Sequence, residues 1–239
     1  MNPSVRRGVQ QTTMMPLRLA SSLFALTVAG SVPAYAQGRI IDEGTFTVTR
    51  AGASHTENFR IARVENGLMK ATGQVVSPTQ RLSSALTFDS LGTAVKYDVT
   101  VTEKGVKTAT VSAERGVARL TARSSDQRGD ESMREYPLTP GQSVLLDDGF
   151  VHQLYAVVLG RKPGTVQVID PRASRTGSAT LSAMGLEPVE VGGKSVTGTH
   201  YSLVSGGVRR EFWLDASGRV LRVEIPSQQL VAAREELPR

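Results

Sequence analysis

Apolar and polar residues alternate along most of the chain after residue 39, and residues 95–102 show the pattern most clearly. There Val, Tyr, Val and Val alternate with Lys, Asp, Thr and Thr. A period of two is typical of a strand with one face in the core. The same period predicts further strands at residues 44–50, 55–64, 68–76, 107–111, 118–123, 188–191, 195–204, 208–214 and 219–225.

Short turn sequences separate these strands, and Asn66-Gly67 is the strongest hairpin signal among them. Strands joined by such turns pair antiparallel, and about a dozen fit the chain. We therefore predict a mainly β fold, a curved antiparallel sheet or incomplete β-barrel, whose last strand ends at Pro226. Residues 139–141 and 172–177 are the segments that we predict to be mobile loops.

One segment, residues 150–159, breaks the alternation with a nearly continuous apolar run. Asp147 and Asp148 precede it and Gly160 follows it, which predicts a short helix with an acidic N-terminus and a glycine stop. Because apolar residues cover most of its surface, this helix must be packed inside the protein. We expect the sheet to wrap around it.

The N-terminal segment has the features of an export signal. Three arginines precede the apolar run 19–29, which is too short to span a bilayer, and Ala34-Tyr35-Ala36 supplies a cleavage site. We predict a cleaved signal at residues 1–36 and one β-rich domain at residues 37–239. The pair Arg6-Arg7 lacks the apolar residues that the twin-arginine route requires, so ordinary secretion is favoured. Translation starting at Met1, Met14 or Met15 leaves this prediction unchanged.

The amino-acid composition limits which cellular compartment and which classes of partner are expected. Removal of the signal lowers the formal net charge from +6 to +3, and the basic residues are spread along strands, so nucleic-acid binding is not indicated. The chain has no cysteine, hence no disulfide and no site for a lipid anchor. An exported protein without disulfides favours the periplasm of a Gram-negative bacterium, or secretion from it.

Candidate catalytic chemistry is sparse. His55, His152 and His200 have no metal-ligand spacing, and the sequence contains no serine-nucleophile motif and no thiol. We interpret Asp147-Asp148 as a helix cap, and Gly-Gly-Lys-Ser at 192–195 as a hairpin turn rather than a phosphate loop. We therefore predict no enzymatic activity, no metal and no cofactor. A rival hypothesis is an enzyme that brings together two of His152, Asp147, Asp148 and His200.

The last hairpin carries a resemblance. Residues 211–223, Glu-Phe-Trp-Leu-Asp-Ala-Ser-Gly-Arg-Val-Leu-Arg-Val, resemble a hairpin of exported bacterial β-proteins of unknown function and of the lipoprotein-carrier (LolA-like) superfamily. The resemblance implies an incomplete barrel closed by helix, with a hydrophobic interior that accepts acyl chains. Carriers of that superfamily have more than one lid helix, whereas this sequence predicts one.

Our first functional hypothesis is therefore a periplasmic binding protein for a hydrophobic or amphipathic, lipid-like ligand. Alternation puts Phe212 and Leu214 on one face of their strand and Trp213 with Glu211 on the other. The residues predicted to line a cavity or its rim are Tyr155, Leu159, Tyr201, Phe212, Trp213, Arg209 and Arg219. The alternative hypothesis is a filled barrel that docks an envelope protein by strand addition.

Overall fold

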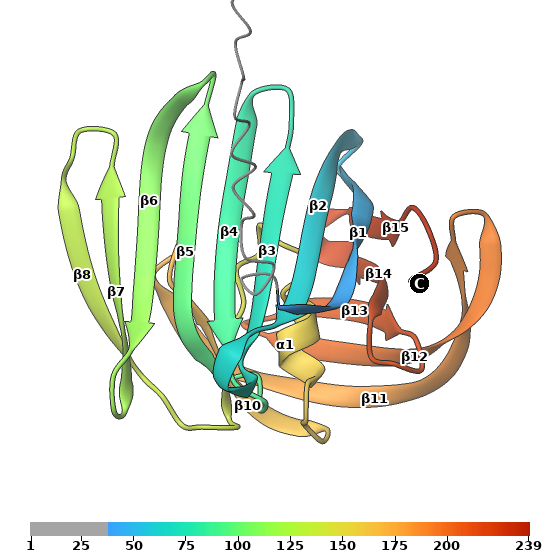
Figure 1. Cartoon of the computed structure of the whole chain (residues 1–239). Helices are drawn as coiled ribbons and strands as arrows, with labels where there is room; N and C mark the ends of the chain where they lie inside the picture. The colour runs from blue at the N-terminus through green and yellow to red at the C-terminus, as the bar shows by residue number, and fades with distance from the viewer. Residues whose placement is uncertain (1–37) are drawn as a thin grey trace, which may run out of the picture. The chain divides into compact units, whose positions relative to one another are not determined.

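The protein forms a single antiparallel sheet that curves around its own core, as seen in a computed structural model that describes residues 38–239 (Figure 1). The predicted export signal lies outside the described residues. The first half of the sheet contains β1 (Arg39–Arg50), β2 (Ala53–Arg63), β3 (Met69–Val76), β4 (Gln80–Phe88), β5 (Ala94–Glu103), β6 (Val106–Arg115), β7 (Arg119–Asp126) and β8 (Glu131–Pro137).

The second half includes one short helix, α1 (Leu154–Val158), between its first two strands. It contains β9 (Ser143–Leu145), β10 (Gly164–Asp170), β11 (Arg175–Val191), β12 (Lys194–Ser205), β13 (Val208–Leu214), β14 (Val220–Ile225) and β15 (Leu230–Arg234). Two 3₁₀ turns, η2 (Glu65–Gly67) and η3 (Pro226–Gln228), complete the secondary structure. Among residues 38–239, no helix has the length and apolar character needed to cross a bilayer.

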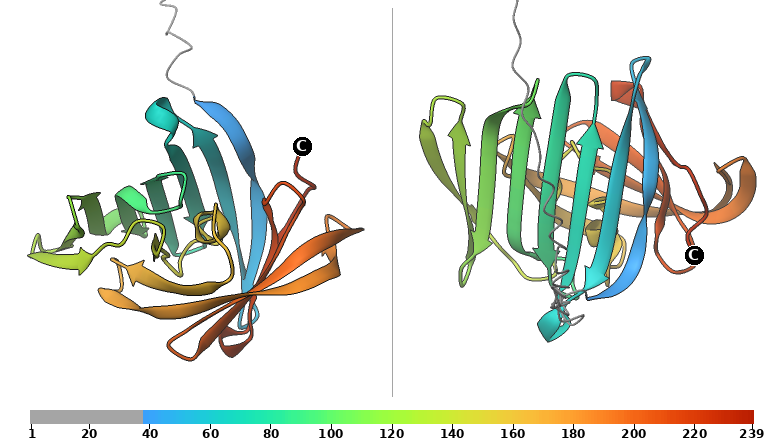
Figure 2. Two further views of the ribbon diagram at one scale, coloured as in Figure 1. Left: turned by 90° about the horizontal axis from the view of Figure 1, so that it is seen from below. Right: turned by 45° about the horizontal axis from the view of Figure 1, so that its top comes forward.

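The strand order explains the shape. It runs β8-β7-β6-β5-β4-β3-β2-β1-β15-β14-β13-β12-β11-β10-β9, so β1 and β15 join the two halves while β8 and β9 are the ends. Figure 2 shows the halves diverging from the β1–β15 seam with α1 between them. All neighbouring strands pair antiparallel except β9 and β10, which are parallel. The prediction of an open, curved, mainly β sheet around one helix is confirmed.

Side chains fill the concavity of the sheet. One continuous apolar cluster extends from Phe46 on β1 through Leu154 and Val157 of α1 to Phe212 on β13. A deep apolar pocket between Phe150, Leu154 and Val223 has a volume of about 20 Å³, room for about one water. The described side chains therefore form a packed interior.

The outer face of the C-terminal strands carries a second, smaller core. Val189, Val191, Trp213 and Leu221 are its buried members. The hairpin of β11 and β12 curls back toward the C-terminal segment (Figure 1), and a Cβ added at Gly192 in its turn would lie 2.4 Å from the carbonyl oxygen of Glu235. Glycine is therefore required at this close approach.

Several sequence predictions are corrected by the structure. The helix spans five residues rather than ten, begins at Leu154 with Gln153 as its N-cap, and has no acidic residue in its first turn, so Asp147 and Asp148 do not cap it. Gly160, with φ of 64°, ends the segment as predicted. Pro226 ends β14 but not the sheet, because β15 follows, and the predicted loop 172–177 already belongs to β11 from Arg175 onward.

Candidate functional site

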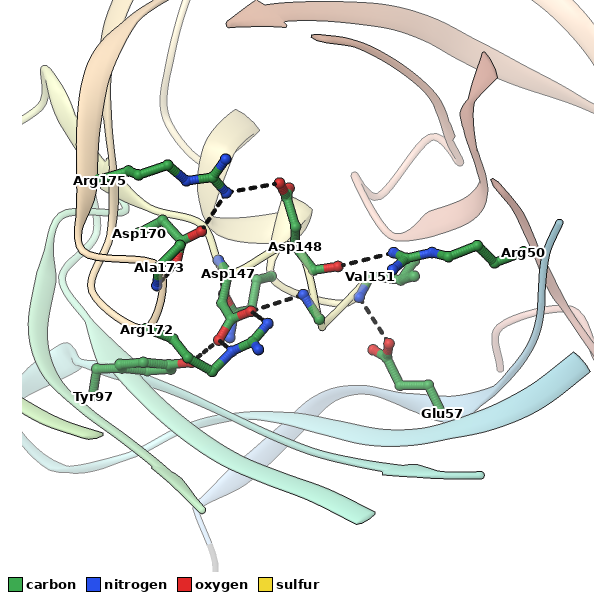
Figure 3. Close-up of polar contacts among 12 residues, drawn as sticks. Arg50, Glu57, Tyr97, Asp147, Asp148, Val151, Asp170, Arg172, Ala173 and Arg175 are labelled. Carbon is green, nitrogen blue, oxygen red and sulfur yellow. Dashed lines mark hydrogen bonds and ion pairs between the residues drawn. The ribbon is translucent and has the colours of Figure 1, made fainter. Parts of the chain in front are cut away.

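The loop between β9 and α1, residues 146–153, is held by several charged contacts, and we call it the clasp loop (Figure 3). Its Asp147 side chain is fully buried. Asp147 Oδ2 accepts hydrogen bonds from Tyr97 Oη at 2.6 Å and Arg172 Nε at 2.7 Å, and Oδ1 accepts from Arg172 Nη2 at 2.5 Å. The backbone N–H of Gly149 adds a bond of 2.7 Å to Oδ1. This carboxylate therefore ties β5 to the turn between β10 and β11.

The electrostatics of this cluster favour one protonation state. Burial raises the pKa of the Asp147 carboxyl, but the hydrogen bonds and charge of Arg172 outweigh burial and hold this pKa below the ordinary 3.8. Burial, followed by the charge of Asp147, raises the pKa of Tyr97 well above 10.0. At neutral pH an ionised carboxylate therefore accepts from a protonated phenol and a guanidinium.

Asp148 faces a separate set of arginines. Arg210 donates from Nε and Nη2 to Asp148 Oδ1 at 3.0 and 2.7 Å, and from Nη2 to Oδ2 at 2.9 Å. Arg175 lies 3.5 Å from Asp148 and 2.9 Å from Asp170, while Arg50 of β1 reaches the backbone carbonyl of Asp148 at 3.4 Å. A cleft of about 170 Å³ opens beside these groups. Asp148 thus links the clasp loop to both halves of the sheet, through Arg50 of the first half and through Arg175 and Arg210 of the second.

A buried pair, Glu57 and His152, fastens the other end of the clasp loop. Glu57 accepts from the backbone N–H of Val151 at 2.8 Å and of His152 at 2.9 Å, and lies 2.7 Å from His152 Nδ1. The imidazole lies over Gly73, where an added Cβ would approach Cε1 to 2.2 Å. Both side chains are at most 1% exposed, so the pair has no open path to a substrate.

The enzyme hypothesis requires two of four residues to meet in one cleft, but the four lie in different environments. These residues are Asp147, Asp148, His152 and His200. Asp148 borders the small cleft, whereas Asp147 and His152 are enclosed by their own partners. His200 lies on the outer face, stacked on Trp213 at 4.5 Å between ring centroids. The described residues contain no group of three side chains suited to a metal ion.

The residues predicted to bind a ligand do not gather at one site. Tyr201 and Phe212 stack at 5.7 Å, and Tyr155 belongs to the same core cluster, with Leu159 packed against it. Trp213 belongs to the outer core, on the opposite face of β13, as the alternation predicted. The structure therefore separates the predicted aromatic set into two clusters.

The two predicted rim arginines do not meet. Arg209 lies at the start of β13 and pairs with Glu211, while Arg219 lies in the turn after β13 and pairs with Asp215 at 2.7 Å. Both guanidiniums are thus engaged by carboxylates at opposite ends of the strand.

A large opening borders an edge of β1 that has no strand partner. β15 pairs with β1 only from Phe46 to Arg50, although β2 pairs with β1 along its whole length. One further bond joins Glu235 N–H to the carbonyl oxygen of Thr45 at 3.0 Å. Among the described residues, no strand pairs with this edge of β1 before Thr45.

A cleft of about 410 Å³ lies between residues 40–45 of β1 and residues 234–239, and we call it the β1 slot. In an antiparallel strand, alternate residues point their N–H and C=O groups to the same side. Because the carbonyl of Thr45 faces the β15 side, the backbone groups of Glu43 face it too. The Glu43 N–H therefore faces the slot as a donor, whereas the Glu43 carbonyl oxygen accepts a hydrogen bond from Arg234 Nη2 at 2.5 Å.

The charge of the slot is acidic. Asp42 and Arg234 neutralise each other in a buried pair with bonds of 2.6 and 2.9 Å. The slot also contains three glutamates, Glu43, Glu235 and Glu236, and one further arginine, Arg239. The sequence analysis missed this site because the strand Leu230–Arg234 was not predicted; its five residues include two alanines and carry only a weak strand pattern.

Comparison with known proteins supports the fold. Neither a protein-family model nor a curated protein matches the chain. Among solved structures, the chain is similar to a Brucella abortus protein described as a beta-barrel-like protein of a domain of unknown function, DUF1849. The likeness covers 83% of this chain and 97% of that chain, with a TM-score of 0.53 and 11% sequence identity. At this identity the likeness shows the shared β-barrel-like fold; the LolA-like resemblance is not confirmed.

Proposed function

We propose that this protein is an exported, non-enzymatic interaction domain that binds an extended segment of an envelope protein by strand addition in the β1 slot. The observation that carries the proposal is the edge of β1 without a strand partner, which borders an opening of about 410 Å³. An unpaired strand edge is a template for another chain, because its N–H and C=O groups form the same ladder as a sheet partner.

The packing of the interior favours this hypothesis over a lipid carrier. An acyl chain needs an apolar cavity of several hundred cubic ångströms. The pocket beside Phe150 holds about 20 Å³, and the clasp loop occupies the space between the two halves of the sheet. The predicted cavity residues Tyr201 and Phe212 pack against each other instead.

Amide exchange of the full chain tests the edge directly. We expect the Glu43 N–H to exchange rapidly, and the Gly44 N–H, which faces β2, to be protected. A terminally blocked heptapeptide of alternating threonine and valine should then protect Glu43 and Thr45. Slow exchange of Glu43 in the free protein would mean that the edge is already paired.

A pair of variants at one position separates backbone pairing from other effects. Glu43→Pro removes the N–H that faces the slot and leaves the β2 side intact, so it should abolish peptide binding. Glu43→Gln keeps that N–H and should retain binding of the threonine–valine peptide. Equal binding by both variants would contradict strand addition.

A further inference from the structure

We propose that the segment bound in the β1 slot runs antiparallel to β1 and carries lysine or arginine at every second position, with apolar residues between them. This inference rests on the proposed function and adds the chemistry of the partner. It follows from the direction of β15, the charge of the slot and its apolar lining.

The direction follows from the sheet itself. β15 lies antiparallel to β1 as far as Phe46, and the bond from Glu235 to Thr45 extends that row by one step. A guest strand beside residues 39–45 continues the row in the same direction. Antiparallel pairing also gives the more stable ladder.

The charges on the outward face select a basic partner. Thr47 Oγ1 donates to Glu235 at 2.9 Å. Thr47 and Glu43 point to the same outward face of β1, so Glu235 lies on that face too. The side chain of Glu43 is 59% exposed and lies 3.6 Å from Arg60, a weak surface pair. Glu236 is 78% exposed. A guest side chain on this face therefore meets carboxylates.

Apolar side chains supply the alternate positions. Ile40, Ile41 and Leu237 also line the slot, and Ile40 is 42% exposed. Ile41 packs against the inner core, whereas Ile40 and Leu237 lie on the outward face with the glutamates. Successive side chains of a strand point to opposite faces, so the inward side chains of the guest meet Ile41 and the outward ones meet the glutamates. An alternating basic and apolar segment fits both.

A second copy of the chain fits less well. Two copies joined antiparallel by their β1 edges would bring Glu43 of one copy near Glu43 of the other. Like charges across a ladder are destabilising. The charges along this edge thus disfavour pairing with a second copy and favour a strand of opposite charge.

Three blocked heptapeptides test the inference, each with valine alternating with threonine, lysine or glutamate. Dissociation constants come from the amide shifts of Glu43 and Thr45 in the labelled full chain. We expect the lysine peptide to bind about tenfold more tightly than the threonine peptide at low salt. The glutamate peptide should bind most weakly. The difference in affinity between the lysine and threonine peptides should shrink at about 1 M salt, where the Debye length is about 3 Å.

Charge variants provide the matched control. The double variant Glu43→Gln, Glu236→Gln should remove most of the lysine advantage, whereas Glu131→Gln on the other exposed edge, β8, should preserve it. If the threonine and lysine peptides bind equally, the charge inference is wrong and the proposed function stands. If no peptide protects Glu43 and Thr45, the proposed function itself fails. A dimer that Glu43→Pro dissociates would assign the slot to a second copy and overturn the inference.

Discussion

Replacing Asp147 by asparagine tests whether the clasp loop holds the two halves of the sheet together. The buried carboxylate accepts two bonds from Arg172 and one from Tyr97, and Asp147→Asn turns one acceptor atom into a donor facing them. A charged hydrogen bond contributes about 1.5–3 kcal/mol. Because the Arg172 side chain is 34% exposed, water replaces part of this loss. We expect the free energy of unfolding to fall by about 2–3 kcal/mol.

Urea unfolding followed by circular dichroism measures the change, with Asp98→Asn as the matched control. Asp98 neighbours Tyr97 on β5, is 50% exposed and lies 3.8 Å from Lys96, so its replacement should change stability by about 0.5 kcal/mol or less. Tyr97→Phe removes a single bond and should cost about 1 kcal/mol. Equal unfolding midpoints for the wild type and Asp147→Asn would refute the clasp.

The pH dependence of the same variant has a defined sign. The pKa of Asp147 is lowered in the folded state. Its stabilisation is therefore complete above the unfolded value of about 3.9 and is lost as pH falls through the folded value. The stability difference between the wild type and Asp147→Asn should be constant near neutral pH and narrow below about pH 4.

Two further outcomes follow from close contacts. Gly73→Ala should lower the free energy of unfolding by about 1–3 kcal/mol, because the new Cβ would lie 2.2 Å from Cε1 of His152. Gly177 has open space around it, so Gly177→Ala should leave the free energy of unfolding nearly unchanged in the same urea assay. Trp213, the single tryptophan, donates to Glu187 at 3.3 Å. The pKa of Glu187 is lowered from 4.5 by hydrogen bonds from His200 and Trp213, so tryptophan fluorescence should change below pH 4.5 in the wild type but not in Glu187→Gln.

Local patterns predicted the hairpins well because a hairpin is decided by neighbouring residues. The Gly192-Gly193 turn joins β11 to β12, and alternation placed Phe212 and Trp213 on opposite faces of β13. β4 was missed although Leu82, Leu86 and Phe88 are buried on one face. Its polar residues, including a buried serine at position 84, weakened the pattern.

The clasp could not be predicted because its partners are distant in sequence. Asp147 meets Tyr97 across 50 residues and Arg172 across 25, and no spacing rule relates them. The acidic pair was therefore assigned to the helix that follows. A continuous apolar run of ten residues also does not distinguish a helix from buried irregular chain. In the structure, the backbone N–H groups of Val151 and His152 donate to the Glu57 carboxylate, which holds these residues outside the helix.

The clasp loop also supports the proposed function on energetic grounds. Opening the concavity for a lipid requires moving a loop held by three carboxylates, Asp147, Asp148 and Glu57. If each attachment contributes about 2–3 kcal/mol, their loss costs about 6–9 kcal/mol, comparable with the whole stability of a typical domain. The β1 slot needs no such opening, because the Glu43 N–H already faces a cleft. A partner that adds a strand there gains ladder hydrogen bonds without disturbing the core, which favours docking at the edge over carriage in the interior.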